Sequence, residues 1–260
     1  MAKPYLLKIA TAILALCTSG VFACSIRVVY SDIATPPYQL GDGETVPDRP
    51  GVGVELVNEA ASRIGCKIDW RRVPNRRVHL ELERGAADAT LGFSYSDERS
   101  AYAVYPMKQG APDANFSVAT LSYYVYVRAD STLNWDGKRF NLQGLTVGVN
   151  PGYSAGQDLR KLGVMVEEAP STENNLLKLQ SGRIAAYVMQ DFPTDTFMRE
   201  HGIKSLVKLQ TPFSSKEYYV PFSKQFFATS PELVSKFWAQ MAEVRKAQGR
   251  ELLRKYGDLN

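Results

Sequence analysis

The chain has 260 residues, of which 45% are hydrophobic and 22% are charged, and its formal net charge is +4 at pH 7. This composition is ordinary for a globular protein, with no low-complexity segment. The small positive charge does not indicate a nucleic-acid partner, and the length suits one large domain or two of modest size.

The N-terminal 23 residues have the pattern of a secretory signal peptide. Lys3 and Lys8 accompany an apolar stretch over residues 6–17, and the small residues Val21 and Ala23 stand at −3 and −1 of a cleavage site. The apolar stretch is well short of the ~20 residues that a membrane-spanning helix needs, and no later segment is long and apolar enough. We therefore expect this segment to be removed on export and the remaining chain to be a soluble protein of the periplasm.

Two cysteines remain after this cleavage site, Cys24 and Cys66. Each comes just before a predicted β-strand, at residues 26–30 and 67–73. If these strands are parallel neighbours, their starts lie about 5 Å apart, which a disulfide can span, and exported proteins commonly carry disulfides. The alternative is a lipoprotein with lipid attached to Cys24, although Phe22 is bulky for that signal. We predict a Cys24–Cys66 disulfide.

The first half of the chain alternates strands and helices. We predict strands at residues 26–30, 67–73 and 88–92, and helices at residues 54–64 and 77–84. Strands that are separated by helical crossovers form a parallel sheet with helices on its faces. A basic cluster follows the second strand: Arg71, Arg72, Arg76 and Arg77. Because no aromatic residues are interleaved with these arginines, the cluster indicates a solvated helix face rather than a nucleic-acid site.

A second series of the same kind follows. We predict strands at residues 145–150, 164–167 and 185–189, and helices at residues 155–162, 172–180 and 191–199. Two β-rich runs, residues 118–127 and 217–222, flank this series, and an amphipathic helix from Pro231 ends the chain. Two open α/β sheets place a ligand where the carboxyl ends of their strands face a cleft. Three loops are predicted to lie there: residues 31–40, 93–99 and 150–156.

Six short motifs occur in order along the chain. They are Ser31-Asp32 with Pro36-Pro37-Tyr38, Gly85-Ala86-Ala87-Asp88-Ala89, Ser94-Tyr95-Ser96-Asp97-Glu98-Arg99, Val147-Gly148-Val149 with Gly152-Tyr153-Ser154, Gly182-Arg183-Ile184, and Tyr219-Val220-Pro221-Phe222 with Lys255-Tyr256-Gly257. They resemble motifs of the family 3 extracellular solute-binding proteins, the polar amino-acid receptors of ABC importers, and they cover essentially the whole chain after residue 23.

The resemblance implies an α/β fold of two lobes, the type II periplasmic binding protein fold, in which each lobe is a mostly parallel sheet flanked by helices. Lobe 1 would comprise residues 24–122 and 222–260, and lobe 2 residues 123–221. The two β-rich runs would form a two-strand hinge that lets the lobes close around a ligand.

The resemblance also implies a ligand site with members from both lobes. These are Asp32, Tyr38, Ser94 and Arg99 in lobe 1, and Gly152, Tyr153, Ser154, Gln190 and Asp191 in lobe 2. The guanidinium of Arg99 is a planar fork of donors that matches a carboxylate. The segment from Gly152 to Ser154 opens a helix, whose free N–H groups and dipole favour an anion. The alternative role of Ser154 is to cap that helix.

The sequence departs from the family pattern at two positions that bear on the ligand. Thr35 stands where the family has an aromatic residue that stacks on the ligand. The ammonium-binding aspartate of the family falls at Gln190, and Asp191 comes one residue later. A shift of one residue at a strand end turns a side chain to the other side. We therefore predict a ligand with a carboxylate and a weaker dependence on a free α-amino group.

Two enzymatic alternatives remain open. Residues 152–156 spell G-x-S-x-G between a predicted strand and a predicted helix, which is the context of a hydrolase nucleophile. With Ser154 as nucleophile, the candidate acids are Asp191 and Asp195 and the candidate base is His201. A dehydratase-like lyase on the receptor fold would need a carboxylic acid beside the ligand, for which Glu173 and Asp191 are the candidates.

The remaining predictions concern cofactors and partners. His79 and His201 are isolated and no cysteine–histidine spacing fits zinc, so we expect no metal and no other cofactor. A sensor domain is a third alternative, but the sequence shows no membrane anchor or output domain. We expect a monomer that binds a small carboxylate, catalyses no reaction and delivers its ligand to an ABC-transporter permease. The delivery follows from the resemblance alone.

Overall fold

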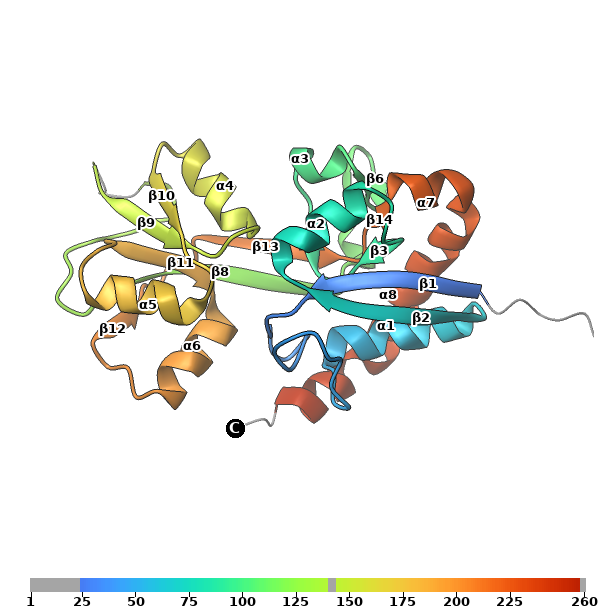
Figure 1. Cartoon of the computed structure of the whole chain (residues 1–260), viewed down its shortest axis with the longest axis horizontal. Coiled ribbons are helices and arrows are strands. Elements are labelled where there is room, and N and C mark those ends of the chain that lie inside the picture. Colours follow the sequence, from blue (N-terminus) through green and yellow to red (C-terminus); the bar gives the residue numbers. More distant parts are fainter. Residues whose placement is uncertain (1–23, 140–143, 258–260) are drawn as a thin grey trace, which may run out of the picture.

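The computed structural model describes residues 24–139 and 144–257, and the predicted signal peptide lies outside these residues. Two groups of helices and strands lie one beside the other along the long axis of the molecule (Figure 1). Strands β8 (Ala119–Arg128) and β13 (Ser214–Tyr219) run between the two groups and pair with each other in antiparallel fashion. None of the helices in the described ranges combines the length and the apolar character that crossing a membrane requires.

The first group is built on a sheet of five strands in the order β2–β1–β3–β14–β5. Their bounds are β1 (Cys24–Ser31), β2 (Cys66–Val73), β3 (Ala89–Thr90), β5 (Ala103–Val104) and β14 (Phe222–Ser223). Its helices are α1 (Val52–Arg63), α2 (Asn75–Glu83), α3 (Asp97–Ser100), α7 (Lys224–Thr229) and α8 (Pro231–Gly257). The pairs β1–β2 and β1–β3 are parallel, as the helical crossovers predict.

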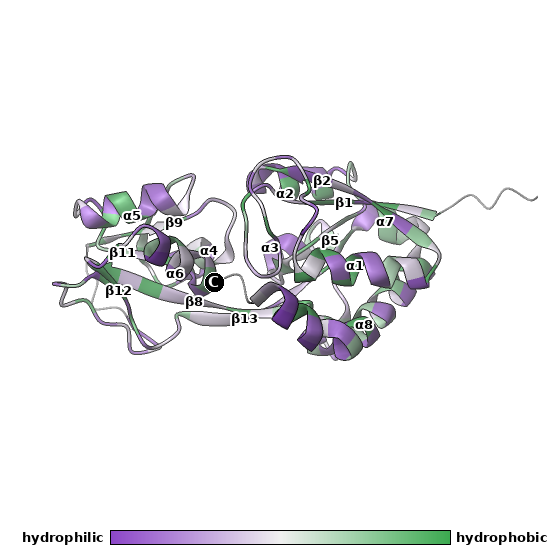
Figure 2. Cartoon of the chain, turned by 90° about the horizontal axis from the view of Figure 1, so that it is seen from below, coloured by the Kyte–Doolittle hydropathy of each residue, from purple (hydrophilic) through white to green (hydrophobic). Residues whose placement is uncertain are grey.

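The first sheet is covered on both faces, as is usual for parallel strands. Val28 of β1 packs in the cluster that contains Leu56 of α1 and Phe237 of α8, whereas the next residue, Val29, packs with Val78 of α2. Because neighbouring residues of a strand point to opposite faces, different helices cover the two faces. Along α1 and α8, hydrophilic and hydrophobic residues alternate in the way that a half-buried helix requires (Figure 2).

Strands β1 and β2 are parallel neighbours in a register that places Cys24 opposite Cys66. A disulfide joins the two residues, whose Cα atoms are 4.4 Å apart. The predicted disulfide is therefore confirmed. The cysteines are the first residues of the two strands rather than the residues before them.

The second group is built on a sheet with the order β10–β9–β11–β8–β13–β4, and β12 pairs with the far end of β8. Its further strands are β4 (Phe93–Ser94), β9 (Thr146–Val149), β10 (Met165–Glu168), β11 (Ala186–Gln190) and β12 (Leu206–Lys208). The helices are α4 (Ser154–Lys161), α5 (Thr172–Gln180) and α6 (Asp191–Glu200). Ser171 caps α5, since its hydroxyl accepts a hydrogen bond from the Asn174 N–H.

One predicted strand is shorter than expected. The strand predicted at residues 88–92 covers only Ala89–Thr90, because Gly92 turns the chain with a φ of +85°. Because this φ is positive, a residue with a Cβ atom would be strained here, and its Cβ would lie 2.7 Å from the Gln39 amide nitrogen, which would have to move. After this turn β4 pairs with β13, and hence joins the second sheet. A short hairpin of β6 (Met107–Lys108) and β7 (Ala111–Pro112) and the 3₁₀ helix Ala114–Phe116 follow.

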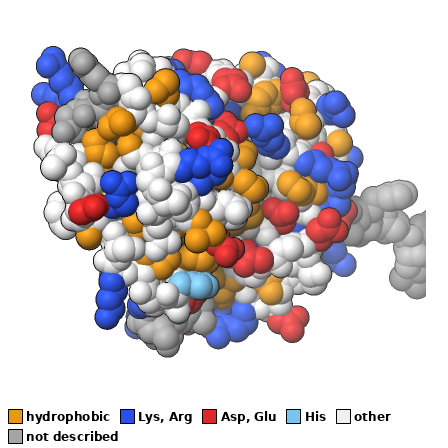
Figure 3. Space-filling view, turned by 60° about the vertical axis from the view of Figure 1, so that its left-hand side comes forward, with side chains coloured by type: hydrophobic (Ala, Val, Ile, Leu, Met, Phe, Trp, Pro, Cys, Tyr) orange, Lys and Arg blue, Asp and Glu red, His pale blue; other side chains and the backbone are white. Residues whose placement is uncertain are grey.

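The interpretation of the basic cluster as one solvated helix face is wrong for two of its four arginines. Arg71 and Arg72 lie in β2, and Arg72 is buried. Its guanidinium donates hydrogen bonds to the Ser31 and Thr45 carbonyl oxygens, which fixes the loop that follows β1. The other two arginines are exposed on α2, and basic and acidic side chains are interspersed over the surface that Figure 3 presents.

Candidate functional site

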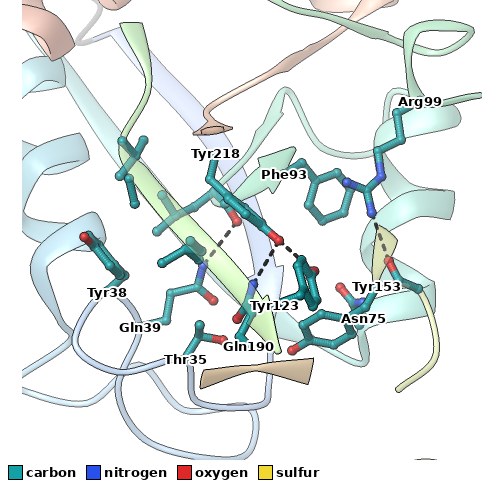
Figure 4. A pocket seen from close by; sticks show the side chains of 16 residues that line it. Thr35, Tyr38, Gln39, Asn75, Phe93, Arg99, Tyr123, Tyr153, Gln190 and Tyr218 are labelled. Atoms are coloured by element: carbon teal, nitrogen blue, oxygen red, sulfur yellow. Dashed lines mark hydrogen bonds between the residues drawn. The ribbon is translucent and has the colours of Figure 1, made fainter. Parts of the chain in front are cut away.

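A cavity lies between the two groups of elements, beside the crossing strands β8 and β13 (Figure 4). The predicted loops after β1 and around Gly152 both reach it. Its wall carries five aromatic residues (Tyr38, Phe93, Tyr123, Tyr153 and Tyr218), four uncharged polar residues with long or hydroxyl side chains (Thr35, Gln39, Asn75 and Gln190) and Arg99. Among the lining residues that the structure describes, Arg99 is the only charged one.

Arg99 is positioned by its own helix and by the short strand before it. Ser96 caps α3 by accepting a hydrogen bond from the Arg99 N–H. The Arg99 side chain is only 6% exposed. Its Nη1 donates to the carbonyl oxygen and the hydroxyl of Ser94, at 2.8 Å and 2.9 Å, and the guanidinium lies 4.7 Å from the centre of the Phe93 ring. Two predicted site residues, Ser94 and Arg99, are therefore together, but Ser94 orients the guanidinium and does not itself line the cavity.

The turn at Gly152 brings the second group to Arg99. Arg99 Nη2 donates to the Gly152 carbonyl oxygen at 3.0 Å. Gly152 has a φ of +77°, and a Cβ atom there would lie 2.5 Å from the Asn75 amide nitrogen. This close approach, together with the positive φ, requires a glycine.

Ser154 is the first residue of α4 and is buried, with 2% of its surface exposed. The N-cap of α4 is Tyr153, and its side chain makes no capping hydrogen bond, so the alternative role of Ser154 as the cap is wrong. The Ser154 hydroxyl lies near the Tyr123 hydroxyl but makes no hydrogen bond of normal geometry with a described residue. The free N–H groups of the first turn of α4 stay available for an anion.

Gln190 is the last residue of β11 and Asp191 the first of α6, and their side chains lie in different surroundings. Gln190 is 2% exposed and lines the cavity. Its amide nitrogen donates to the Tyr218 hydroxyl at 2.9 Å, and this hydroxyl is 2.7 Å from that of Tyr123. Asp191 starts the helix, accepts a hydrogen bond from the Phe192 N–H and is not part of the cavity wall. Of the two predicted ligand-binding residues, Gln190 therefore lines the cavity and Asp191 lies outside its wall.

The other predicted residues of the first loop are divided between two hollows. Tyr38 lines the main cavity, as does Thr35, whose N–H and carbonyl pair with Gln39. Asp32 lies instead in a neighbouring hollow, which shares Asn75 and Tyr153 with the main cavity. Tyr153 and Asn75 stand at the boundary between the two hollows and separate Asp32 from the main cavity.

Three polar residues of the cavity lie outside the loops that the sequence predicted to face it. Tyr123 and Tyr218 come from the crossing strands, and Asn75 begins α2. Tyr123 belongs to a β-rich run noted in the sequence, but nothing in that run indicates which face of the strand meets a ligand. Burial raises the pKa of both tyrosines, so their hydroxyls stay protonated at neutral pH and act as neutral hydrogen-bond groups.

Contacts between the two groups surround one end of the cavity. The Asn75 side chain donates to the Pro151 carbonyl oxygen at 3.0 Å, and the His79 Nε2 atom lies 3.3 Å from the Gly152 carbonyl oxygen. Arg76 forms an ion pair with Glu168 at 2.7 Å. We call the contacts of Asn75, His79 and Arg99 with residues 151–152 the clasp. The clasp joins α2 and α3 of the first group to the turn before α4 in the second.

For neither enzymatic alternative do the described residues bring the candidate catalytic side chains together. His201 is exposed, stacks on Phe197 and bonds through Nδ1 to the Phe197 carbonyl oxygen, whereas Ser154 is buried at the start of α4. Asp195 bonds to the hydroxyl of Tyr126 and pairs with Lys208. The lyase candidate Glu173 is exposed on α5 and is absent from the cavity wall. Residues 24–139 and 144–257 also hold no group of three or more potential metal ligands.

No family model and no curated protein matches this sequence, but solved structures do. The P235GK mutant of ArgBP from T. maritima has a TM-score of 0.67 and 21% identity, over 90% of this chain and 95% of that one. A histidine kinase sensor domain with similarity to periplasmic binding proteins has a TM-score of 0.71 and 20% identity, over 89% and 95%. An ancestral arginine-binding protein bound to arginine has a TM-score of 0.68 and 19% identity, over 89% and 97%. These likenesses show the fold, and the predicted fold class, that of periplasmic binding proteins, is confirmed.

Proposed function

We propose that this chain is an exported solute receptor whose two lobes close on a small ligand that carries a carboxylate. The observation that carries the proposal is Arg99, a buried cation that faces the cavity between the two sheets. The fold supports it, because structural neighbours of this chain are amino-acid-binding proteins.

The hydrogen bonds of Arg99 leave room for a carboxylate. A guanidinium has five N–H groups. Three are engaged, two by Ser94 and one by the Gly152 carbonyl oxygen. The remaining two suffice for a bidentate contact with a carboxylate, which is the geometry that arginine favours. The N–H groups in the first turn of α4 supply further donors from the opposite lobe.

The lobes are proposed to comprise residues 24–122 with 222–260 and residues 123–221, with β8 and β13 as the hinge. The clasp is then a set of contacts made on closure, since every one of its bonds joins one lobe to the other. In this proposal the chain acts in the periplasm as a monomer, catalyses no reaction and hands its ligand to the permease of an ABC importer. A sensor domain among the structural neighbours makes signalling the second candidate.

Native mass spectrometry of freshly purified protein tests the proposal, because a receptor that closes on its ligand can retain it through purification. We expect a bound acid of low mass, which then raises the melting temperature when it is added back. At 100 times its dissociation constant a ligand adds about 2.7 kcal/mol to the stability of the folded state. For a protein of this size that corresponds to roughly 5–10 °C. A retained ligand without any acidic group would contradict the proposal.

His79 gives ligand binding an expected pH dependence. Burial, helped by the nearby charge of Arg99, lowers the pKa of His79 from 6.5 to about 4, and the ring also contacts the Tyr102 hydroxyl at 2.7 Å. When the lobes open, the ring regains water and its pKa returns toward 6.5. Opening therefore takes up a proton below pH 6.5, and acid favours the open form. We expect the affinity for the retained ligand to fall by up to about tenfold for each pH unit between pH 6.5 and pH 4.

The variant His79→Gln isolates this effect. Glutamine can still donate a hydrogen bond to the Gly152 carbonyl oxygen, but it does not titrate. Calorimetric titrations from pH 7 to pH 5 should show the steep fall in the parent protein and only the titration of the ligand in the variant. Equal slopes for the two proteins would rule out His79 as the titrating group.

A further inference from the structure

The charges around the cavity indicate which net charge a ligand can carry, beyond the carboxylate that Arg99 would bind. The wall contains one cation and, among its described residues, no carboxylate. The two acids on either side of it are engaged elsewhere: Asp32 lies in the neighbouring hollow, and Asp191 bonds to the start of its own helix. A ligand that leaves water for this cavity therefore meets a net positive charge.

Gln190 adds a neutral acceptor at the back of the cavity. Its amide nitrogen bonds to the Tyr218 hydroxyl, while its oxygen has no hydrogen-bond partner among the described residues and is buried. The Tyr218 hydroxyl accepts this hydrogen bond from the amide nitrogen and is itself hydrogen-bonded to the Tyr123 hydroxyl. This acceptor carries no charge, so it can accept a hydrogen bond from an ammonium group but cannot neutralise the charge of that group.

Apart from the polar residues Thr35, Gln39 and Asn75, the rest of the wall is apolar or aromatic. Figure 4 shows Arg99 at one end of the cavity and Tyr38 at the other, with Tyr218 between them. The side chains of Leu91, Val118 and Leu121 complete the wall. Such a surface is complementary to an uncharged apolar body that extends away from the carboxylate.

We propose that the site selects a monocarboxylate with an uncharged apolar or aromatic body, and that Gln190 excludes zwitterionic amino acids. This inference rests on the proposed receptor function. An α-ammonium group would be buried beside Arg99 with amide and hydroxyl oxygens as partners but no carboxylate, and a buried charge without an opposite charge is strongly disfavoured.

Three ligands of one skeleton separate the inference from the proposed function. 3-Phenylpropionate carries the carboxylate alone, L-phenylalanine adds the α-ammonium group, and 3-phenyl-1-propanol lacks the carboxylate. Isothermal titration at pH 7.5 should give the acid an affinity at least about 30-fold above that of either other compound, the fold-change that corresponds to an unpaired buried charge or the loss of a charged partner.

The variant Gln190→Glu tests the residue itself, with Gln190→Asp as the second variant in case one of them folds poorly. A carboxylate at this position supplies the missing partner of an ammonium group and repels an acid. We expect the ratio of the 3-phenylpropionate affinity to the L-phenylalanine affinity to fall at least tenfold. Asp191→Asn is the matched control: it changes a charge one residue away, outside the cavity, and should leave the ratio unchanged.

The outcomes divide clearly. If L-phenylalanine binds the parent protein as tightly as 3-phenylpropionate, and both better than the alcohol, the receptor function stands and the inference is wrong. If the alcohol binds as well as the acid, the carboxylate site itself is wrong, and the proposed function fails with it. Failure of 3-phenylpropionate to bind, or an unchanged ratio in both Gln190 variants, would also overturn the inference.

Discussion

Replacing Arg99 by alanine is expected to lower the affinity for a carboxylate ligand by about 30- to 5,000-fold, because the loss of a buried charged partner costs about 2–5 kcal/mol. The size of this effect follows from burial, since only 6% of the Arg99 side chain is exposed. Arg99→Lys should recover part of the affinity at most, because a lysine keeps the charge but lacks the planar fork of donors. Isothermal titration of both variants measures the change.

Arg76→Ala is the matched control for this experiment. Arg76 also joins the two lobes, through its ion pair with Glu168, but it is exposed and does not line the cavity. Exposed ion pairs contribute about 0–1 kcal/mol, so we expect at most about a fivefold change. Normal binding by Arg99→Ala, in a variant that unfolds at the same temperature as the parent protein, would show that the site is assigned wrongly.

Loss of the Cys24–Cys66 disulfide is expected to lower the free energy of unfolding by about 2–4 kcal/mol. The two cysteines are 42 residues apart, and the cross-link limits the conformations of the loop between them in the unfolded chain. Because the bond joins the first residues of two paired strands, its removal also allows the edge of the first sheet to fray. Urea unfolding of the parent protein and of the Cys24→Ser/Cys66→Ser variant measures the difference.

Reducing agent provides the internal control for the disulfide. It should destabilise the parent protein to the level of the double variant and leave the double variant unchanged. Thiol labelling of the denatured, unreduced protein without residues 1–23 should find no free cysteine. Two labelled thiols, or a diacylglycerol mass on Cys24, would favour the lipoprotein alternative instead.

The sequence predicted the elements of the second lobe well because each is marked locally. The helices at residues 154–161, 172–180 and 191–200 begin within one residue of the predicted positions. The strand after Gly85 was predicted too long, because the chain turns at Gly92 and then pairs with the distant strand β13. Contacts of this kind leave no periodic signal in the sequence around the strand.

The sequence predicted only part of the candidate site, again because some of its residues are marked by local motifs and others are brought together by contacts between distant segments. Arg99, Gly152 and Tyr153 belong to motifs whose order along the chain indicates their place, and they line the cavity. Tyr123 and Tyr218 lie on strands that cross from one lobe to the other, and only the pairing of those strands brings their hydroxyls together. Asp32 and Asp191 were also predicted in the site, but Asp32 lines the neighbouring hollow and Asp191 starts α6, because the chain direction at each strand end decides where the side chain points.

The clasp has a consequence for the rate at which a ligand leaves. Asn75, His79 and Arg99 all bond to carbonyl oxygens of residues 151 and 152 at one end of the cavity. In the proposed receptor we expect a bound molecule to leave after the clasp opens. Its residence time is then set by the protein's own opening rate, so that ligands of different affinity dissociate at similar rates once opening is the slow step.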